Sequence, residues 1–367
     1  MDKKIIKVLM LIPSLGVADG VASFAMNYFK CVDHSNVHID FAVFSDSISP
    51  HYYDDIVKLG SKVFILHSPR FLVRHIKECK RILQGDKYDV IHDNTLLKSL
   101  PLMILAKKCI PVRILHSHNS KFAETFLKSI RNRLFYPLLK ATATNYAACS
   151  DVAGKACFGQ SEYKIIANII DRNLFCFNPK IRTRVRKENN ACDKIIIGSV
   201  GRLAKQKNPF FAISVIAQLI KQNNKIEYWW IGDGPLFQTI KNRIDELGLQ
   251  NRIKCLGTRT DIRELYQGMD LFFMPSVFEG LPIALIEAQA MGLPCVISDI
   301  ISKEATYTDL VTHISLKKQK NTWVSAILEQ LSQKHDRVLP ENTVKNCVFF
   351  STNAGKLLEA FYTSLIK

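Results

Sequence analysis

Two glutamates eight residues apart are the side chains of this sequence best placed to bind a ligand. Glu279 and Glu287 lie in the segment SVFEGLPIALIEAQAMG, where a predicted buried strand leads into a turn and then a helix that begins near Pro282. Unpaired backbone N–H groups and the helix dipole favour phosphate at such a helix start. A carboxylate on each side can accept hydrogen bonds from sugar hydroxyls. The alternative for any glutamate pair at this spacing is two exposed surface residues.

A basic pair, Arg202 and Lys207, follows another predicted strand in the segment SVGRLAKQKNP. Ligands of α/β sheets bind beyond the carboxyl ends of the strands, and Gly201 allows close approach to the backbone. Two cations at this place would stabilise a diphosphate, above all as it departs with its negative charge. A solvated surface pair is the alternative for two cations five residues apart.

Two histidines, His116 and His118, stand at strand alternation in RILHSHN, where a predicted strand ends. Either can be a structural residue or a metal ligand. The sequence offers no identifiable further ligands, and it contains no Asp-x-Asp motif that would hold a divalent cation. We therefore expect metal-independent chemistry without a cofactor.

These residues must be positioned by strands that alternate with helices along both halves of the chain. Several apolar runs are continuous rather than alternating, which is typical of parallel strands buried on both faces. The sequence therefore predicts an α/β fold with two Rossmann-like, doubly wound domains facing a central cleft. The predicted strands are 5–12, 37–44, 62–66, 88–92 and 112–116, then 194–200, 225–231, 252–256, 271–274 and 294–298.

A chain of 367 residues suits two domains better than one core. The charged stretch 179–193 loses hydrophobic periodicity, so we predict a surface linker there, between domains at 1–178 and 194–350. Residues 351–367 are predicted to form a C-terminal helix that packs back toward the N-terminal domain. The apolar face of that helix is expected to hold Leu357, Leu358, Phe361 and Leu365.

Composition narrows the class of protein. A content of 47% hydrophobic and 23% charged residues excludes a mainly disordered chain. The net charge of +17 favours an anionic partner, but the basic residues are spread along the chain without an RNA-binding signature or zinc finger, so no nucleic acid is expected. Ten cysteines without paired spacing, and no apolar run of roughly 20 residues, favour a cytoplasmic protein. The basic and then apolar start is interpreted as a buried strand rather than a signal peptide.

The segment 121–140 combines lysines and arginines with apolar residues at a spacing of four. Such a helix can lie on an anionic membrane, here the inner face of the cell membrane, or it can pack its apolar stripe into the core. Core packing is the favoured alternative, and membrane association stays open. The apolar stripe consists of Phe122, Phe126, Ile130, Leu134 and Leu138.

Together these motifs resemble glycosyltransferase family 4, the retaining enzymes with the two-lobed GT-B fold. The segment with Glu279 and Glu287 resembles the Glu-x7-Glu signature of that family, and the stretches 199–209, 229–236 and 256–276 resemble the regions around it. In the first half, the stretches 20–44 and 113–119 resemble members that build capsular polysaccharides and exopolysaccharides. The resemblance extends over nearly the whole chain.

The resemblance implies roles for individual residues. Arg202 and Lys207 match the basic pair on the donor diphosphate. Glu279 matches the residue that contacts the transferred sugar, and Glu287 the one that binds the ribose hydroxyls. His118 matches a histidine that faces the donor sugar. The remaining donor-binding positions implied by the resemblance are Gly20, Thr258, Arg259, Gly280, Leu281, Pro282 and Ile283.

The resemblance also implies an activity. It is transfer of a hexosyl group, with retention, from a nucleoside diphosphate sugar such as a UDP-sugar to a glycan or lipid-linked glycan in bacterial surface polysaccharide synthesis. The N-terminal domain would bind the acceptor and the C-terminal domain the nucleotide sugar. The loop SLGVADG (14–20) lacks the adjacent glycines of many relatives, and there Asp19 is expected on the acceptor side.

Three alternatives remain open from the sequence. A UDP-sugar 2-epimerase can share the two-lobed architecture. An NAD-dependent oxidoreductase would need a Gly-x-Gly-x-x-Gly turn after a strand, which neither SLGVADG nor SVGRLA supplies. A non-enzymatic basic protein that binds nucleic acid or membrane would need only the charge.

Overall fold

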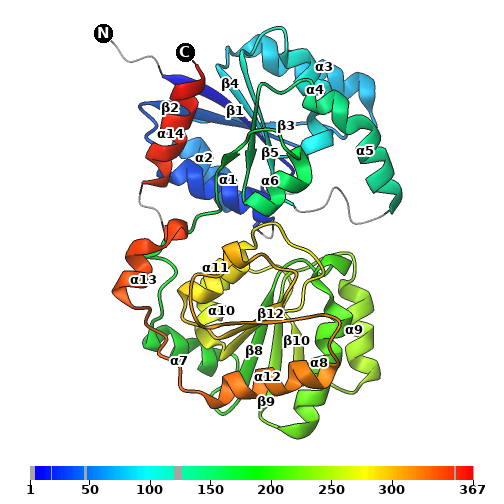
Figure 1. The fold of residues 1–367 in the computed structure, drawn as a ribbon, viewed down its shortest axis with the longest axis vertical. Helices are drawn as coiled ribbons and strands as arrows, with labels where there is room; N and C mark the ends of the chain where they lie inside the picture. The colour runs from blue at the N-terminus through cyan, green and yellow to red at the C-terminus, as the bar shows by residue number, and fades with distance from the viewer. Residues whose placement is uncertain (1–4, 18, 45–47, 120–125, 351–352, 367) are drawn as a thin grey trace. The chain divides into compact units, whose positions relative to one another are not determined.

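The computed structural model describes residues 5–17, 19–44, 48–119, 126–350 and 353–366 (Figure 1). They form a parallel sheet of seven strands and another of six, with helices between successive strands. The chain divides into two units, Met1–Ile169 with Ser351–Lys367 and Ile170–Phe350, each built on one sheet. The predicted α/β class with two doubly wound sheets is confirmed.

The first unit has the strand order β3-β2-β1-β4-β5-β6-β7. Its order reverses direction between β1 and β4, and doubly wound sheets bind ligands at the carboxyl ends of the strands beside such a reversal. The strands are β1 (Ile6–Ile12), β2 (Val37–Val43), β3 (Val63–Ile65), β4 (Val90–Asp93), β5 (Val112–Ser117), β6 (Asn145–Ala148) and β7 (Lys164–Ile165). The helices are α1 (Gly20–Cys31), α2 (Pro50–Lys58), α3 (Leu72–Gly85), η1 (Leu96–Ser99), α4 (Leu100–Ala106), α5 (Phe126–Lys140), α6 (Asp151–Phe158) and α14 (Ala354–Leu365).

The second unit repeats this plan with the order β10-β9-β8-β11-β12-β13, and its reversal lies between β8 and β11. Its strands are β8 (Ile195–Val200), β9 (Ile226–Ile231), β10 (Ile253–Cys255), β11 (Leu271–Met274), β12 (Cys295–Ser298) and β13 (Val311–Ile314). Its helices are α7 (Pro179–Glu188), η2 (Lys205–Lys207), α8 (Pro209–Gln222), α9 (Phe237–Glu246), α10 (Ile262–Gly268), α11 (Ile283–Ala290), η3 (Lys303–Ala305), α12 (Lys320–Ser332), α13 (Glu341–Asn346) and η4 (Val348–Phe350).

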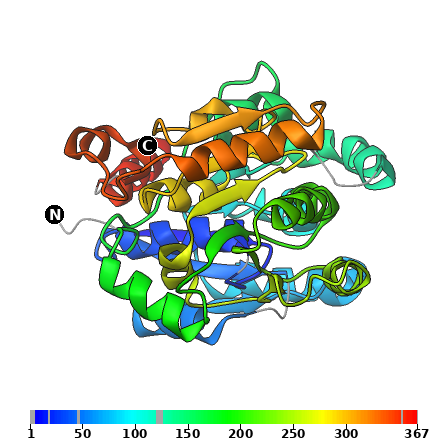
Figure 2. The same ribbon diagram turned by 90° about the horizontal axis from the view of Figure 1, so that it is seen from below.

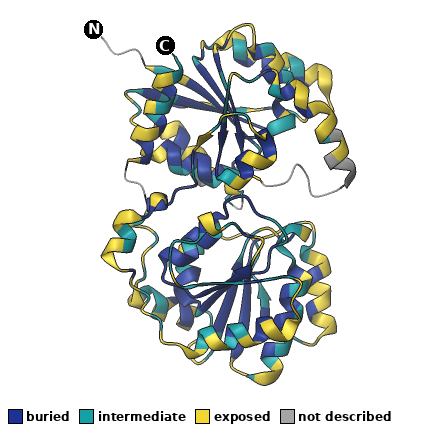
Figure 3. Ribbon diagram, viewed as in Figure 1, coloured by how far each residue is buried: buried dark blue, intermediate teal, exposed yellow. Residues whose placement is uncertain are grey.

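Continuous apolar runs became the central strands, because these strands are covered on both faces. All residues from Val8 to Ile12 in β1 are buried, and β1 pairs in parallel with both β2 and β4. Figure 3 shows buried strands within helices whose outer surfaces are exposed. The strands β6, β7 and β13 were not predicted, because their residues (NYAA, KI and VTHI) include polar or exposed positions and form no continuous apolar run.

The second sheet is likewise enclosed by helices on both faces (Figure 2). Tyr228 and Trp230 of β9 belong to one buried cluster with α8, α9 and α12. Trp229 points the other way, where a Cβ on Gly268 of α10 would lie 3.1 Å from its ring. Alternation along one strand therefore joins two separate layers of core to one sheet.

The predicted surface linker is wrong for residues 179–188, which form helix α7. Asn178 caps the helix by accepting hydrogen bonds from Lys180 and Ile181, and Pro179 occupies its first turn. Val185 and Arg186 are buried. The charged run concealed this helix, because much of its stability comes from arginines that pair inward rather than from an apolar stripe.

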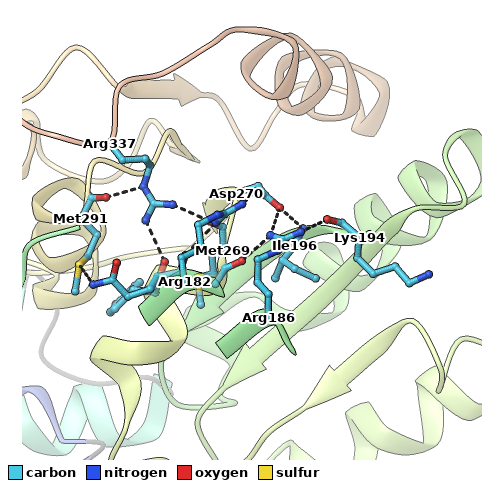
Figure 4. Close-up of polar contacts among 11 residues, drawn as sticks. Arg182, Arg186, Lys194, Ile196, Met269, Asp270, Met291 and Arg337 are labelled. Atoms are coloured by element: carbon cyan, nitrogen blue, oxygen red, sulfur yellow. Dashed lines mark hydrogen bonds and ion pairs between the residues drawn. The ribbon is translucent and has the colours of Figure 1, made fainter. Parts of the chain in front are cut away.

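Three arginines join α7 and the chain after α12 to the end of α10 (Figure 4). Arg182 and Arg186 each contact one carboxylate oxygen of Asp270. Arg337 donates to the carbonyls of Met291 (2.7 Å), Met269 (2.9 Å) and Tyr266 (3.2 Å). These carbonyls lie at or near helix ends, where intrahelical donors run out, so the cation complements the helix dipoles there.

The C-terminal helix α14 packs with the first unit, against α1. Its buried face holds Ala354, Gly355, Leu358 and Tyr362, whereas Leu357 is 66% exposed. The predicted apolar face was therefore partly wrong. Gly355 permits the contact, because a Cβ there would collide with the backbone of Cys31.

Candidate functional site

The segments that follow β8 and β11 carry most of the predicted donor-binding residues of the second unit. These two strands are neighbours at the reversal of strand order, where a doubly wound sheet leaves a crevice for a ligand. The loops are tied together by a backbone hydrogen bond of 2.8 Å from Val277 to Gln206. Residues far apart in the sequence thus meet at one edge of the sheet.

Lys207 and Glu279 form a buried ion pair at this edge. Lys207 Nζ lies 2.7 Å from Glu279 Oε1, with 16% and 7% of the two side chains exposed. Gln206 Nε2 donates to the other carboxylate oxygen at 3.2 Å and to the carbonyl of Phe278 at 3.1 Å. The cation expected at a phosphate and the carboxylate expected at a sugar are therefore held as one unit.

Two glycines allow the chain to pack closely beside this ion pair. Gly201 has φ +146°, and a Cβ there would lie 2.8 Å from Lys207 Cε, so any side chain would displace the lysine. Gly232 has φ +135°, and its Cβ would collide with the carbonyl of Gly201. The same carbonyl accepts a hydrogen bond of 2.9 Å from Trp230 Nε1. The WWIGDGPL motif thus holds the Gly201 loop at close backbone range.

Helix α11 begins at this edge without a side-chain cap. Pro282 is its N-cap residue, and it makes no side-chain capping hydrogen bond to the first turn. Gly280, Leu281 and Ile283 are buried around this start. The predicted helix start near Pro282 agrees with the structure, and its geometry suits an anion.

Glu287 lies one turn into α11 and is held by Tyr266 of α10. The Tyr266 hydroxyl lies 3.0 Å from Glu287 Oε2 and 3.1 Å from the carbonyl of Ala284. Burial raises the pKa of the Glu287 carboxyl to about 7, against the lowering effects of Tyr266 and Arg263. A carboxyl poised in this way can accept hydrogen bonds from ligand hydroxyls when ionised.

The other predicted positions of the second unit are exposed. Arg202 lies on the loop after β8, and Thr258 and Arg259 follow β10. Arg259 is engaged by Asp261 through hydrogen bonds of 2.7 and 2.6 Å. The side chain of Arg259 is thus engaged within the protein. A contact from Arg259 to a nucleotide base would therefore come from its backbone.

In the first unit, His118 follows β5 and is fixed by three neighbours. Its Nε2 lies 2.8 Å from Asn94 Oδ1. Phe24 packs edge-on against its ring at 4.7 Å, and His116 stacks on it at 4.1 Å. Burial lowers the pKa of His118 to about 3, assisted by His92. The ring is therefore neutral at physiological pH.

His116 is a core residue rather than a ligand. Its Nδ1 lies 2.9 Å from His92 Nε2, and His92 Nδ1 lies 2.8 Å from the hydroxyl of Tyr362 in α14. All three side chains are fully buried. Across the described part of the chain, no group of three histidines, cysteines or acidic residues is arranged to hold a metal ion.

Asp19, which was expected on the acceptor side, caps helix α1. One carboxylate oxygen accepts from the backbone of Val21 at 2.9 Å, and the other accepts from Ser14 Oγ at 2.7 Å. Both oxygens are thus engaged within the loop. Gly20 starts the helix in an exposed position, where an added Cβ would meet nothing within 4 Å.

Comparison with known proteins identifies the family of this chain. Residues 181–346 match the family described as glycosyl transferases group 1. EpsF of Bacillus subtilis (strain 168), named as a glycosyltransferase, is 33% identical over 324 residues, which cover 84% of this chain and 83% of EpsF. The chain belongs to this glycosyltransferase family.

Other relatives of the glycosyltransferase are consistent with this. An Escherichia coli UDP-Gal:alpha-D-GlcNAc-diphosphoundecaprenol alpha-1,3-galactosyltransferase is 28% identical over 304 residues, covering 77% of this chain and 76% of that protein. HepE of Anabaena, solved in complex with UDP, superposes with a TM-score of 0.73 at 18% identity, covering 98% of this chain and all of HepE. WaaG gives a TM-score of 0.73 at 14% identity, with 97% and 99% covered. The fold is GT-B.

The resemblance to glycosyltransferase family 4 is confirmed. The epimerase, oxidoreductase and non-enzymatic alternatives are therefore set aside.

Three residues that support the glycosyltransferase site were missed from the sequence. Gln206 holds Glu279, Tyr266 holds Glu287, and Asn94 holds His118. A signal existed for Asn94, since it ends the strand run VIHDN as a polar residue at the ligand-binding edge of the sheet. Gln206 and Tyr266 had none, because their partners lie 73 and 21 residues away in the sequence.

Proposed function

We propose that this glycosyltransferase moves a hexosyl group, with retention of configuration, from a UDP-sugar to a hydroxyl of a lipid-linked glycan. The observation that carries the proposal is the buried Lys207–Glu279 pair beside the uncapped start of α11. It provides a cation and helix N–H groups for a diphosphate, and a carboxylate for the sugar attached to it.

The protein's share of the chemistry is stabilisation of the departing charge. The bond from the anomeric carbon to the UDP oxygen breaks, while the acceptor oxygen bonds to that carbon on the same face. The acceptor proton passes to the departing phosphate oxygen. Lys207, Arg202 and the start of α11 stabilise the resulting UDP, so neither a side-chain nucleophile nor a metal ion is required.

The nucleoside is held by Glu287, whose carboxylate accepts hydrogen bonds from the ribose hydroxyls. UDP is favoured as the carrier because HepE was solved with UDP and with UDP-glucose, and the Escherichia coli relative is named for UDP-Gal. Backbone groups of Gly280 to Ile283 would lie against the sugar and diphosphate, and those of Thr258 and Arg259 near the base. In the first unit, His118 would face the transferred sugar, with Gly20 beside the donor.

The acceptor is proposed to be lipid-linked and reached at the cytoplasmic face of the membrane. The name of the Escherichia coli relative includes a diphosphoundecaprenol acceptor. None of the ten cysteines, all within the described residues, forms a disulfide, which suits a reducing compartment. In the described residues no helix is long and apolar enough to cross a bilayer. Docking through α5 would supply the membrane contact.

A ligand screen tests the donor proposal. UDP, GDP, ADP and their sugars are added separately while thermal unfolding is followed, since a ligand that binds only the folded state raises its stability with occupancy. UDP compounds should raise the midpoint, and the others should not. A shift with GDP or ADP compounds and none with UDP would refute the UDP assignment.

A further inference from the structure

The amide of Asn94 fixes the proton of His118, and with it the kind of group that His118 can bind. Asn94 is 4% exposed and stands directly after β4, and His118 stands directly after its neighbour β5. Both therefore lie at the carboxyl edge of the first sheet, where doubly wound sheets bind their ligands.

The orientation of the Asn94 amide follows from its surroundings. One end of the amide lies 3.1 Å from the carbonyl oxygen of Leu11 and 3.2 Å from that of His92. Carbonyl oxygens only accept hydrogen bonds, so this end must be the NH₂ group. The opposite end, Oδ1, then faces His118 Nε2 at 2.8 Å. An amide oxygen also only accepts, so Nε2 of His118 must carry a proton.

The second nitrogen of His118 is then a bare acceptor. The ring is neutral because burial lowers its pKa to about 3, so a proton on Nε2 leaves Nδ1 without one. Phe24 and His116 hold the plane of the ring. Among the described residues, no hydrogen bond to Nδ1 is found, and this atom is absent from the buried polar atoms without a partner. Nδ1 is thus left for a ligand.

We propose that Asn94 is a positioning residue, which holds His118 in the Nε2–H tautomer so that Nδ1 accepts a hydrogen bond from a hydroxyl of the transferred sugar. The proposal rests on the proposed function for the place of the sugar. It makes His118 a recognition group for a hydroxyl, which has a proton to give. A carboxylate or phosphate oxygen would meet a lone pair there and be rejected.

The tautomer is measured directly on the wild-type protein. Nitrogen–proton correlation NMR with isotope-labelled histidine, assigned by loss of the signal in His118→Gln, distinguishes the protonated ring nitrogen from the bare one. We expect Nε2–H at neutral pH, unchanged down to about pH 5 given the lowered pKa. An Nδ1–H tautomer or a charged ring at neutral pH would overturn the proposal, whatever the enzyme's substrate.

The variant Asn94→Leu tests the positioning role. It keeps the approximate volume but removes the acceptor, so the proton should move to the accessible Nδ1, where water can accept its hydrogen bond. Retention of Nε2–H in a folded Asn94→Leu protein would contradict the assignment. If this variant does not fold, the wild-type spectrum still decides the tautomer.

Kinetics with monodeoxy analogues of UDP-glucose and UDP-galactose connect the tautomer to the sugar. In the wild type, one analogue should lose about tenfold in kcat/KM, on the scale of one hydrogen bond. The same deletion should cost less than about twofold in His118→Ala and in Asn94→Leu, while the affinity for UDP alone stays unchanged. Equal losses in all three proteins would refute the proposal. Failure of the wild type to bind UDP would instead refute the proposed function and leave the tautomer result standing.

Discussion

At the scale of single residues, the site depends on buried charges that hold one another. Lys207 and Glu279 are each too buried to be left alone, since an unpaired charge in such a place costs several kcal/mol. In the function proposed above, their pairing keeps a cation in place for the diphosphate before any ligand arrives. Preorganised charge of this kind needs no rearrangement during the reaction.

Replacement of Lys207 with alanine should lower turnover of the UDP-sugar by about 10²-fold, the scale seen when one preorganised electrostatic donor is lost. The matched control is Lys205→Ala, which removes an exposed lysine from the same short helix η2. Steady-state rates of UDP release measure both. Equal rates for Lys207→Ala and the control would remove Lys207 from the donor site.

Replacement of Glu287 with glutamine should raise the KM for the UDP-sugar more than it lowers kcat, because ribose contacts act on binding. The wild-type KM should fall as pH rises through about 7, where the carboxyl ionises, and the variant should lack this dependence. Initial rates between pH 6 and 8 provide the measurement. If the KM of Glu287→Gln depended on pH in the same way as that of the wild type, another group would be the one that titrates.

The raised pKa of Glu287 should also make the free energy of unfolding depend on pH. The pKa of Glu287 is raised from 4.5 in the unfolded chain to about 7 in the fold, so the native state holds the extra proton between these values. Its contribution to the free energy of unfolding is therefore present below about pH 4.5 and is lost as pH rises toward 7. Urea denaturation across this range should show a smaller decline for Glu287→Gln than for the wild type.

At the scale of elements, the exposure of α5 bears on whether its apolar stripe packs into the core or lies on a membrane. Ile130, Leu134 and Leu138 are 51%, 74% and 49% exposed, whereas Tyr136 and Leu139 are buried. The favoured expectation that the apolar stripe packs into the core is thus wrong for these members. Residues 121–125, with Phe122, lie outside the described residues. An exposed apolar stripe on a helix rich in basic residues suits an anionic membrane surface.

We expect the protein to sediment with vesicles that contain anionic phosphatidylglycerol at low salt, and Leu134→Glu to reduce this binding several-fold. The control Leu247→Glu introduces the same charge at a partly exposed leucine of the second unit. Vesicle sedimentation with and without anionic lipid is the assay. Wild-type protein that stays in the supernatant at low salt would rule out docking through α5.

The arginine cluster is the second feature at this scale. Arg337→Met should lower the free energy of unfolding by about 1 to 3 kcal/mol, the cost of one unsatisfied buried acceptor, because the carbonyl of Met291 loses its donor, whereas that of Met269 keeps Arg182 and that of Tyr266 keeps the backbone N–H of Met269. Arg243→Met, which removes an exposed arginine paired with Glu246, should change it by less than about 1 kcal/mol. Urea denaturation compares the two. Similar losses for both variants would mean that the carbonyl of Met291 is otherwise satisfied.

At the scale of the whole molecule, the chain closes by returning its last helix to the unit where it began. Backbone N–H of Asp33 donates to Glu359 at 2.6 Å, and Tyr362 reaches His92 in the core of the first sheet. The first unit is therefore incomplete until the end of the chain has been made.

Gly355→Val should lower the free energy of unfolding by about 2 kcal/mol or more, because the added side chain overpacks the contact with Cys31. Leu357→Ser, on the 66% exposed face of the same helix, should cost less than about 0.5 kcal/mol. Chemical denaturation distinguishes them. If both variants matched the wild type, α14 would contribute little to the stability of the first unit.

The sequence by itself determined the class of fold and the family. Long apolar runs specify parallel strands because burial on both faces leaves no polar side, and the helix start after Glu279 follows from local turn chemistry with Pro282. These signals lie within single segments of the sequence, so they can be recognised without knowing which elements pack against one another. A strand without a continuous apolar run, such as β6 (Asn145–Ala148), carries too little of this signal.

Only the tertiary structure decided which side chains hold one another. The pairing of Lys207 with Glu279, the turning of Arg186 toward Asp270, and the contact of Asn94 with His118 each join residues from different elements. Charge and hydrogen bonding act over a few ångströms in space, and the order of strands in the sheet sets which residues come within that distance. The structure also gives Asp19 the role of helix cap, because the N–H donors at the start of α1 lie within hydrogen-bond distance of its carboxylate.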